Sequence, residues 1–380
     1  RGRPLHPAVR EGWNFGEVAD NARFPQATQL ELGGTGIGTF NDRLRDAVRG
    51  GGPFDGDPRI QGLASGLGTA DNGAPANGDP AARDARLLRY HDQIKVGMVG
   101  NLAAYGFTGS DGTRRTGRDV DYNGSPAGYT ALPGEAVTYV DAHDNETLYD
   151  ALAYKLPAAT GMPDRVKLQQ LGLATVLLGQ GLAFVHAGSE QLRSKSLDRN
   201  SYDSGDWFNR LLWDCSAGNG FGAGLPPAPD NEDKWSYARP LLADPGLRAD
   251  CGAMEESRAR FGELLRMRTS TALFSLGDAA AIGDQVSFPL TGDGRDAPGL
   301  LAMHVTDPTD VDPRWASVTV LVNAGAARLV TVDQLAGAGA RPHPVQADGV
   351  DPEVRAVTVD NATGAVRVPA RSLVVLVAPQ

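Results

Sequence analysis

Apolar residues in the first 270 positions form short strand-like runs and longer helical stripes. Residues 136–140 and 182–186 are compact apolar runs, which predict two buried strands. Between them, residues 165–178 carry leucines and valines at helical spacing, which predicts a buried amphipathic helix. A strand, a helix and a second strand in this order predict a parallel α/β sheet.

The remaining pattern before residue 270 predicts three further helices and one long loop. Residues 39–50, 81–97 and 255–267 each place apolar side chains on one helical stripe. Residues 50–80 are rich in Gly, Asp, Asn and Pro and predict a long loop insertion with at most a short helix. Residues 6–10 are a poor match to a buried strand.

Beyond residue 270 the pattern changes to short strand-like runs separated by Gly, Asp and Pro. These runs cover residues 286–290, 300–305, 318–322, 329–332, 354–359 and 372–378. Short alternating runs with frequent turn residues predict an all-β sandwich. We therefore expect two domains, an α/β domain over residues 1–270 and a β-sandwich over residues 271–380.

Composition and charge narrow the class of ligand. The chain has 380 residues, 41% of them hydrophobic and 22% charged, as in ordinary globular proteins. A net charge of -10 and a pI near 5.1 argue against a nucleic-acid partner, which requires a basic face. No apolar run approaches the roughly 18 residues of a membrane span, so no membrane partner is predicted.

The two cysteines leave their redox state open, and the glycine-rich stretch does not match a nucleotide-binding loop. Cys215 and Cys251 could form one disulfide or remain two free thiols, and their spacing matches no zinc site. Residues 33–38 are glycine-rich, but no hydrophobic strand precedes them and no Walker lysine follows. Nucleotide binding is therefore not predicted.

Two polar clusters are candidates for a sugar site. His143, Asp144 and Asn145 lie in the loop after the predicted strand 136–140, where side chains can face a ligand, although the same residue types also cap helices and close turns. Glu11 lies two positions before Trp13, and a carboxyl beside an aromatic ring can donate a proton while the ring stacks on a sugar. The alternative is an exposed glutamate beside a core tryptophan.

Residues 187–210 mix polar side chains with Tyr202, Trp207 and Phe208. Such a mixture fits a carbohydrate groove, because sugars offer hydroxyls at their edges and C–H faces for stacking. The alternative is a solvated loop with three buried anchors. Asp203, Asp206 and Asp214 are candidate calcium ligands, but their spacing matches no regular calcium loop, so no cofactor is assigned.

Several motifs together resemble the type I pullulanases and limit dextrinases of the α-amylase superfamily. They are Glu11-Gly-Trp-Asn-Phe-Gly-Glu-Val18 and the segments 33–40, 121–124, 142–150 and 193–209. The resemblance extends over nearly the whole chain and is looser in the sandwich. It implies the C-terminal half of a (β/α)8 TIM barrel, about strands five to eight, followed by a β-sandwich. It also implies hydrolysis of α-1,6 branch linkages in pullulan, amylopectin or limit dextrins by a retaining mechanism.

The resemblance assigns roles residue by residue. It implies that Glu11 is the general acid/base and that Asp144 is the carboxylate that grips the substrate hydroxyls and distorts the ring. It implies that His143 donates a hydrogen bond to the same sugar. The weaker matches are expected to line the groove, and they are Trp13, Asn145, Arg193, Asp206 and Asn209.

The sequence also departs from the family pattern. The family's nucleophile is an aspartate in a Phe-Arg-Phe-Asp-like segment before the Glu-Gly-Trp motif, and this chain has ten residues there without it. Arg10 stands where the family has glycine. We therefore expect a fragment whose partner is the missing N-terminal half of the barrel, inactive and aggregation-prone alone because its sheet edges are open.

Two other functions remain as alternatives. The chain could be a non-catalytic α-glucan-binding fragment, or it could belong to a glucanotransferase on the same scaffold. In each case the expected ligand is an α-glucan oligosaccharide or polysaccharide. The richness in Arg, Ala, Gly and Asp favours a bacterial protein. The resemblance implies a secreted or periplasmic location, although plastid and cytoplasmic relatives exist in the family.

Overall fold

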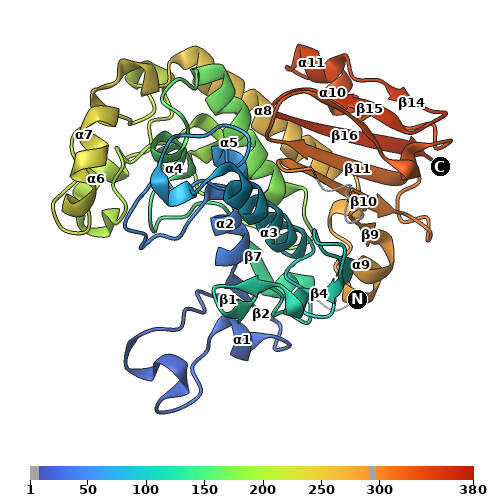
Figure 1. The fold of residues 1–380 in the computed structure, drawn as a ribbon, viewed down its shortest axis with the longest axis horizontal. Helices are drawn as coiled ribbons and strands as arrows, with labels where there is room; N and C mark the ends of the chain where they lie inside the picture. Colours follow the sequence, from blue (N-terminus) through green and yellow to red (C-terminus); the bar gives the residue numbers. More distant parts are fainter. Residues whose placement is uncertain (1–7, 291–296) are drawn as a thin grey trace.

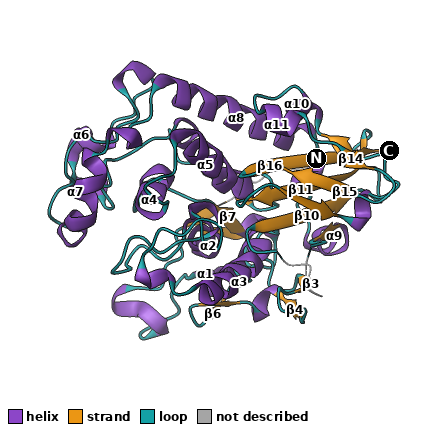
Figure 2. Cartoon of the chain, turned by 45° about the horizontal axis from the view of Figure 1, so that its top comes forward, coloured by secondary structure: helices purple, strands orange, loops and turns teal. Residues whose placement is uncertain are grey.

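The structure, a computed structural model, describes residues 8–290 and 297–380 (Figure 1). It contains one parallel sheet, a set of helices and several antiparallel sheets, so it is a mixed helix and sheet protein. The long antiparallel strands gather at one end of the molecule, and most of the long helices lie beside them (Figure 2).

Four short strands form a parallel sheet whose spatial order β1-β2-β7-β8 follows the chain. Their bounds are Ala8–Arg10, Ile37–Phe40, Ala136–Thr138 and Leu182–Ala183. Parallel strands end at the same edge of a sheet, so the loops that follow them gather there. The parallel sheet predicted from residues 136–186 is confirmed, whereas its closure as half of a barrel remains a prediction.

The start of this sheet differs from expectation. The poor strand predicted over residues 6–10 forms a parallel pair with β2 at Ala8–Arg10, and residues 6 and 7 lie outside the described residues. The helix predicted over 39–50 begins later, because β2 extends to Phe40. Asn41 then caps α2 (Asp42–Arg49) by accepting a hydrogen bond from the Leu44 N–H at 3.2 Å.

The glycine-rich stretch before β2 binds a carboxylate of the chain itself. The backbone N–H groups of Gly34 and Gly36 donate to Glu135 at 3.0 and 2.6 Å. Burial disfavours the ionised carboxyl, but these donors and the N–H groups of Ala131 and Leu132 hold the pKa of Glu135 below its ordinary value. The loop thereby ties the start of β2 to the start of β7.

Most of the helices lie in the chain between strands of the parallel sheet, or between that sheet and the antiparallel sheets. Those predicted over 81–97, 165–178 and 255–267 are confirmed as α3 (Pro80–Met98), α5 (Met162–Leu177) and α8 (Cys251–Ser270). The other helices are α1 (Gln29–Leu32), α4 (Leu148–Lys155), α6 (Gly205–Asn209), α7 (Trp235–Ala243), α9 (Ala279–Gln285), α10 (Pro344–Ala347) and α11 (Pro352–Arg355). In the part of the chain described, no helix is long and apolar enough to cross a bilayer.

Helix α4 was not predicted. Every residue from Leu148 to Lys155 is buried, including Asp150 and Lys155. A helix that is buried all round shows no polar face, and two charged residues inside it obscure the apolar pattern. The sequence therefore carries no amphipathic signal for α4, although this helix directly follows the loop that bears His143 and Asp144.

The predicted strand runs after residue 285 form two antiparallel sheets. One sheet has the order β13-β16-β11-β10-β9 and the other has the order β12-β15-β14. The first sheet consists of Arg341–Pro342, Ser372–Pro379, Trp315–Asn323, Leu300–Thr306 and Val286–Ser287. The second consists of Arg328–Thr331, Ala365–Val368 and Val359–Asp360. Leu321 and Val374 of the first sheet share a buried cluster with Val366 of the second.

One predicted strand was wrong in part. Residues 354–359 begin inside α11, and strand β14 covers only Val359–Asp360. Pro352 occupies the first turn of α11, and Asp351 accepts hydrogen bonds from the N–H groups of Glu353 and Val354. A capping aspartate followed by proline favours a helix start over a strand.

The larger antiparallel sheet is buried on both faces. Leu301 and Met303 of β10 belong to the cluster that contains Leu264 and Met267 of α8, whereas Leu300 faces the smaller sheet. The same α8 cluster includes Leu44 of α2 and Ile94 of α3. The boundary predicted near residue 270 coincides with the end of α8, but one hydrophobic core crosses it. The division into two domains remains a prediction.

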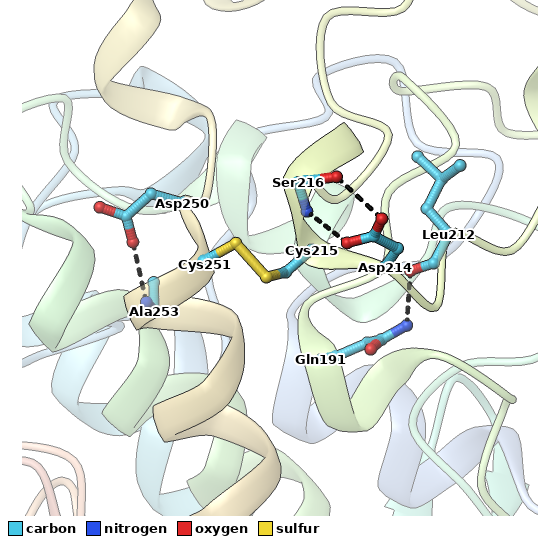
Figure 3. Close-up of a disulfide and its surroundings, with 8 residues drawn as sticks. All are labelled: Gln191, Leu212, Asp214, Cys215, Ser216, Asp250, Cys251 and Ala253. Carbon is cyan, nitrogen blue, oxygen red and sulfur yellow. Dashed lines mark hydrogen bonds between the residues drawn. A yellow bond between two sulfur atoms is a disulfide. The ribbon is translucent and has the colours of Figure 1, made fainter.

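The structure resolves the question about the cysteines. Cys215 and Cys251 form a disulfide with a sequence separation of 36 (Figure 3). Cys251 is the first residue of α8, whose N-terminus is capped by Asp250 through the Ala253 N–H at 2.8 Å. The disulfide therefore fastens the segment after α6 to the start of α8.

We expect reduction of this disulfide to destabilise the chain. A crosslink across a 36-residue separation restricts the unfolded ensemble, and its loss should lower the free energy of unfolding by about 3 to 4 kcal/mol. Urea unfolding with and without dithiothreitol measures the difference, and a Cys215→Ser/Cys251→Ser double variant serves as the control that reductant should not affect. Equal midpoints for the wild-type chain in both conditions would contradict the expectation.

Buried histidines should make the chain sensitive to acid. Burial lowers the pKa of His91 to about 3 and the pKa values of His304 and His343 to about 4. The unfolded chain binds these protons near pH 6.5, so stability is complete above that pH and falls as the pH drops toward 4. Replacing His304, which bonds Thr319 at 2.8 Å, by glutamine should reduce the loss of unfolding free energy between pH 6.5 and 5 by up to about 2 kcal/mol. Urea titrations at both pH values test this, and an unchanged pH slope in His304→Gln would reject it.

Candidate functional site

A cavity of about 790 Å³ opens beside the ends of the parallel strands. Its lining combines the segment after β1, the start of α2, the hairpin that contains Tyr122 and the loop after β7. Among the described residues that line it are Glu11, Trp13, Phe15, Phe40, Asp42, Arg43, Phe54, Tyr122, Tyr139, His143, Asp144 and Asn145. Carboxylates, an imidazole and aromatic rings therefore face the same space.

Glu11, His143 and Asp144 meet in this cavity. Their ligand-type atoms all lie within 4.8 Å of one another, and all three side chains are exposed. The imidazole Nδ1 of His143 is 3.1 Å from the Asp144 carboxylate. Two segments far apart in the sequence, at residue 11 and at residues 143–144, thus supply a carboxyl pair with an adjacent hydrogen-bond donor. Exposed acidic groups commonly gather without an ion, so the cluster alone assigns no metal.

The turn that carries Glu11 requires a glycine. Gly12 has a φ of +80°, and a Cβ atom there would lie 2.8 Å from the Thr39 side chain. The Gly12 carbonyl accepts a hydrogen bond from the Gln29 N–H at 2.9 Å. The side chain of Gln29 then donates to the Phe40 carbonyl at 2.6 Å and to Asp42 at 3.0 Å. The acid-bearing turn is therefore tied to the end of β2.

A buried cation supports this connection from α2. Arg43 donates to the side chains of Gln29 and Asp42. Its guanidinium lies over the rings of Tyr122 and Tyr129, 5.0 and 4.9 Å from their centroids. Cation–π contact and charged hydrogen bonds replace the water that the buried guanidinium gives up. Gln29, Asp42, Arg43 and Tyr122 of this arrangement line the same cavity as Glu11.

A second pair of contacts connects the neighbouring strand end. Arg45 donates to the Tyr139 hydroxyl at 2.7 Å and pairs with Asp46, which accepts from the Tyr122 hydroxyl at 2.6 Å. Burial raises the pKa of Tyr139 to about 12, so this hydroxyl remains a neutral donor or acceptor. These residues were not predicted, because the apolar stripe of α2 indicates only an ordinary amphipathic helix. The repeated charged positions 42, 43, 45, 46 and 49 were the available signal.

The weaker site predictions divide into two groups. Trp13 and Asn145 line the cavity, as expected for groove residues. Arg193, Asp206 and Asn209 do not belong to the described lining. Arg193 donates to the carbonyls of Ala187 and Asn209, and the Asn209 amide donates to backbone carbonyls of the same segment. These side chains fix the course of residues 187–210.

The candidate calcium ligands do not gather. Asp203, Asp206 and Asp214 form no group of metal-ligating atoms within the described residues. Asp214 instead accepts hydrogen bonds from the N–H and hydroxyl of Ser216, at 3.0 and 2.9 Å (Figure 3). In this arrangement the three carboxylates do not come together, and the carboxylate of Asp214 caps the short helix Cys215–Ala217.

Comparison with known proteins identifies the relatives of this chain. Residues 216–379 match the family described as alpha-1,6-glucosidases, pullulanase-type, C-terminal. The chain is 40% identical over 376 residues to pullulanase 1, chloroplastic, of Arabidopsis thaliana and 39% identical over 380 residues to a pullulanase of Klebsiella pneumoniae. Each match covers 97% of this chain but only 38% and 34% of those relatives. The chain thus spans little more than a third of their length.

Solved structures give the same relationship. Klebsiella pneumoniae pullulanase complexed with maltotriose matches with a TM-score of 0.89 and 38% identity, over 98% of this chain and 35% of that chain. The apo pullulanase of Paenibacillus barengoltzii matches with a TM-score of 0.64 at 24% identity, which concerns the fold alone. The chain is thus similar to pullulanases over nearly its whole length, and residues 216–379 match the pullulanase-type C-terminal family.

Proposed function

We propose that the protein to which this chain contributes hydrolyses α-1,6-glucosidic branch linkages, and that the cavity at Glu11 and Asp144 binds the α-glucan. The meeting of Glu11, His143 and Asp144 in one open cavity is the observation that carries this proposal. The relatives named pullulanase support the activity, and the maltotriose complex of one of them supports a glucan ligand.

Each member of the cluster has a distinct proposed role. Glu11 donates a proton to the leaving oxygen and later removes one from water, as a retaining glycosidase requires. Asp144 accepts hydrogen bonds from sugar hydroxyls, and His143 donates to the same sugar while bonded to Asp144 at 3.1 Å. Trp13 and Asn145 add a stacking surface and an amide at the cavity wall.

The architecture enters the proposal as well. We infer that β1, β2, β7 and β8 are the second half of a (β/α)8 barrel within residues 1–270, with the sandwich over residues 271–380 as a separate domain. Parallel strands in chain order with active-site loops at one edge support this inference. The remaining strands and the nucleophile aspartate would come from polypeptide other than these 380 residues.

The two alternatives predict different products. A non-catalytic fragment would retain glucan without releasing reducing ends. A glucanotransferase would rearrange glucans into longer or differently linked products. The exposed carboxyl pair in the cavity favours hydrolytic chemistry for the parent enzyme over a purely structural role.

We expect this chain by itself to release no reducing ends from pullulan. It contains no aspartate in the family's nucleophile motif, and loss of the nucleophile removes several orders of magnitude in rate because catalytic groups act as a unit. A reducing-sugar assay with Klebsiella pneumoniae pullulanase as the positive control measures this. Turnover by the chain that Glu11→Gln abolishes would overturn the expectation.

Binding should survive and depend on Asp144. We expect isothermal titration of the chain with maltotriose to give measurable affinity, and Asp144→Asn to weaken it about tenfold or more, because hydrogen bonds to a charged group are lost.

Asp206→Asn is the matched control, since this carboxylate is also exposed but lies outside the cavity lining. It should leave maltotriose affinity unchanged. If Asp206→Asn weakened binding as strongly as Asp144→Asn, the assignment of the glucan site to this cavity would fail.

A further inference from the structure

The loop that presents His143 and Asp144 joins β7 to α4 and is held at both ends by one buried carboxylate. Asp141 accepts hydrogen bonds from the Leu148 N–H at 2.9 Å and from the Ser189 hydroxyl at 2.5 Å. It therefore links the start of the loop to the first residue of α4. Within the loop the chain reverses through Asn145, whose φ is +60°.

The middle of the loop rests on a buried ammonium group. The Nζ atom of Lys195 donates to the backbone carbonyl of His143 at 2.9 Å and to the Ser201 hydroxyl at 3.0 Å. Lys195 is only 1% exposed. Its donor therefore meets the backbone of the residue whose imidazole and neighbouring carboxylate face the cavity.

Helix α4 holds Lys195 in place. The Asp150 carboxylate accepts hydrogen bonds from the backbone N–H of Lys195 at 2.7 Å and from the Ser194 hydroxyl at 2.5 Å. The Asp150 N–H in turn donates to Thr147 at 3.1 Å, at the end of the His143 loop. Hydrogen bonds thus connect the loop, α4 and residues 194–201. The Lys195 ammonium supplies those to His143 and Ser201.

We propose that Lys195 is a positioning residue for the glucan site, which acts through the His143 carbonyl to fix the His143–Asp144 pair relative to Glu11. This inference rests on the proposed function for its consequence but not for its geometry. Burying an ammonium group is costly unless it is hydrogen-bonded, and its partners here are the His143 carbonyl in the loop itself and the Ser201 hydroxyl. A neutral side chain of similar length fills the same space without bonding His143.

The decisive measurement follows His143 directly. We expect Lys195→Met to shift the imidazole resonance of His143 in histidine-labelled, ligand-free chain, assigned with a His143→Gln variant. The same substitution should weaken maltotriose affinity about tenfold, because the pair that contacts sugar becomes mobile. Lys195→Arg should restore both readouts at least in part.

Lys155→Met is the matched control. Lys155 is also buried, but its Nζ atom donates to the Pro58 carbonyl at 3.0 Å, outside the His143 loop. The Lys155→Met substitution should lower the midpoint of thermal unfolding, as Lys195→Met does. It should leave the His143 resonance and the maltotriose affinity unchanged. Equal effects of both substitutions on the His143 resonance would reduce Lys195 to a merely structural residue and overturn the proposal.

Two outcomes separate this inference from the proposed function. If the wild-type chain does not bind maltotriose, the glucan proposal fails for this chain, while the His143 resonance still decides the positioning role. If Lys195→Met does not fold, Ser201→Ala removes one acceptor of the ammonium and should shift the His143 resonance in the same direction by a smaller amount. An unchanged resonance in Ser201→Ala would then overturn the proposal.

Discussion

The geometry of the site depends on one constraint: buried charged side chains must keep their hydrogen-bond or ionic partners. The side chains of Glu11, His143 and Asp144 are exposed, but the segments that carry them are held by buried charged groups. Arg43 fixes the turn of Glu11 through Gln29, and Lys195 reaches the carbonyl of His143. A buried charge accepts few alternative arrangements, because each lost partner leaves an unpaired ion in a medium of low polarity. The exposed side chains of the site are therefore carried on backbone that is held in place.

The same constraint explains which parts were predictable from the sequence. Periodicity located α3, α5, α8 and the parallel strands β7 and β8, because these elements bury apolar stripes or runs. Strand-end placement brought His143 and Asp144 forward as site residues, the pairing with Trp13 brought Glu11 forward, and the fold gathers the three. Trp13 and Asn145 also reach the cavity, whereas Arg193 and Asn209 bond backbone carbonyls instead.

The sequence did not reveal which charged side chains are buried in the protein. Helix α4 escaped prediction because Asp150 and Lys155 are buried in it. The last two residues of β2 were assigned to a helix, because the pattern of Phe40, Leu44 and Val48 fits helical spacing until the cap at Asn41 is known. Periodicity assumes that charged positions face water, and it fails where they do not. In this chain those failures lie close to the site, at α2, α4 and the segment around Lys195.

The disulfide between Cys215 and Cys251 has a practical consequence for producing this protein. Reducing compartments keep cysteines as free thiols, whereas oxidising compartments allow the disulfide to form and persist. Material made in an ordinary bacterial cytoplasm would then begin folding with the segment after α6 detached from the start of α8. Export to the periplasm, or a host with an oxidising cytoplasm, is the appropriate route to a homogeneous preparation.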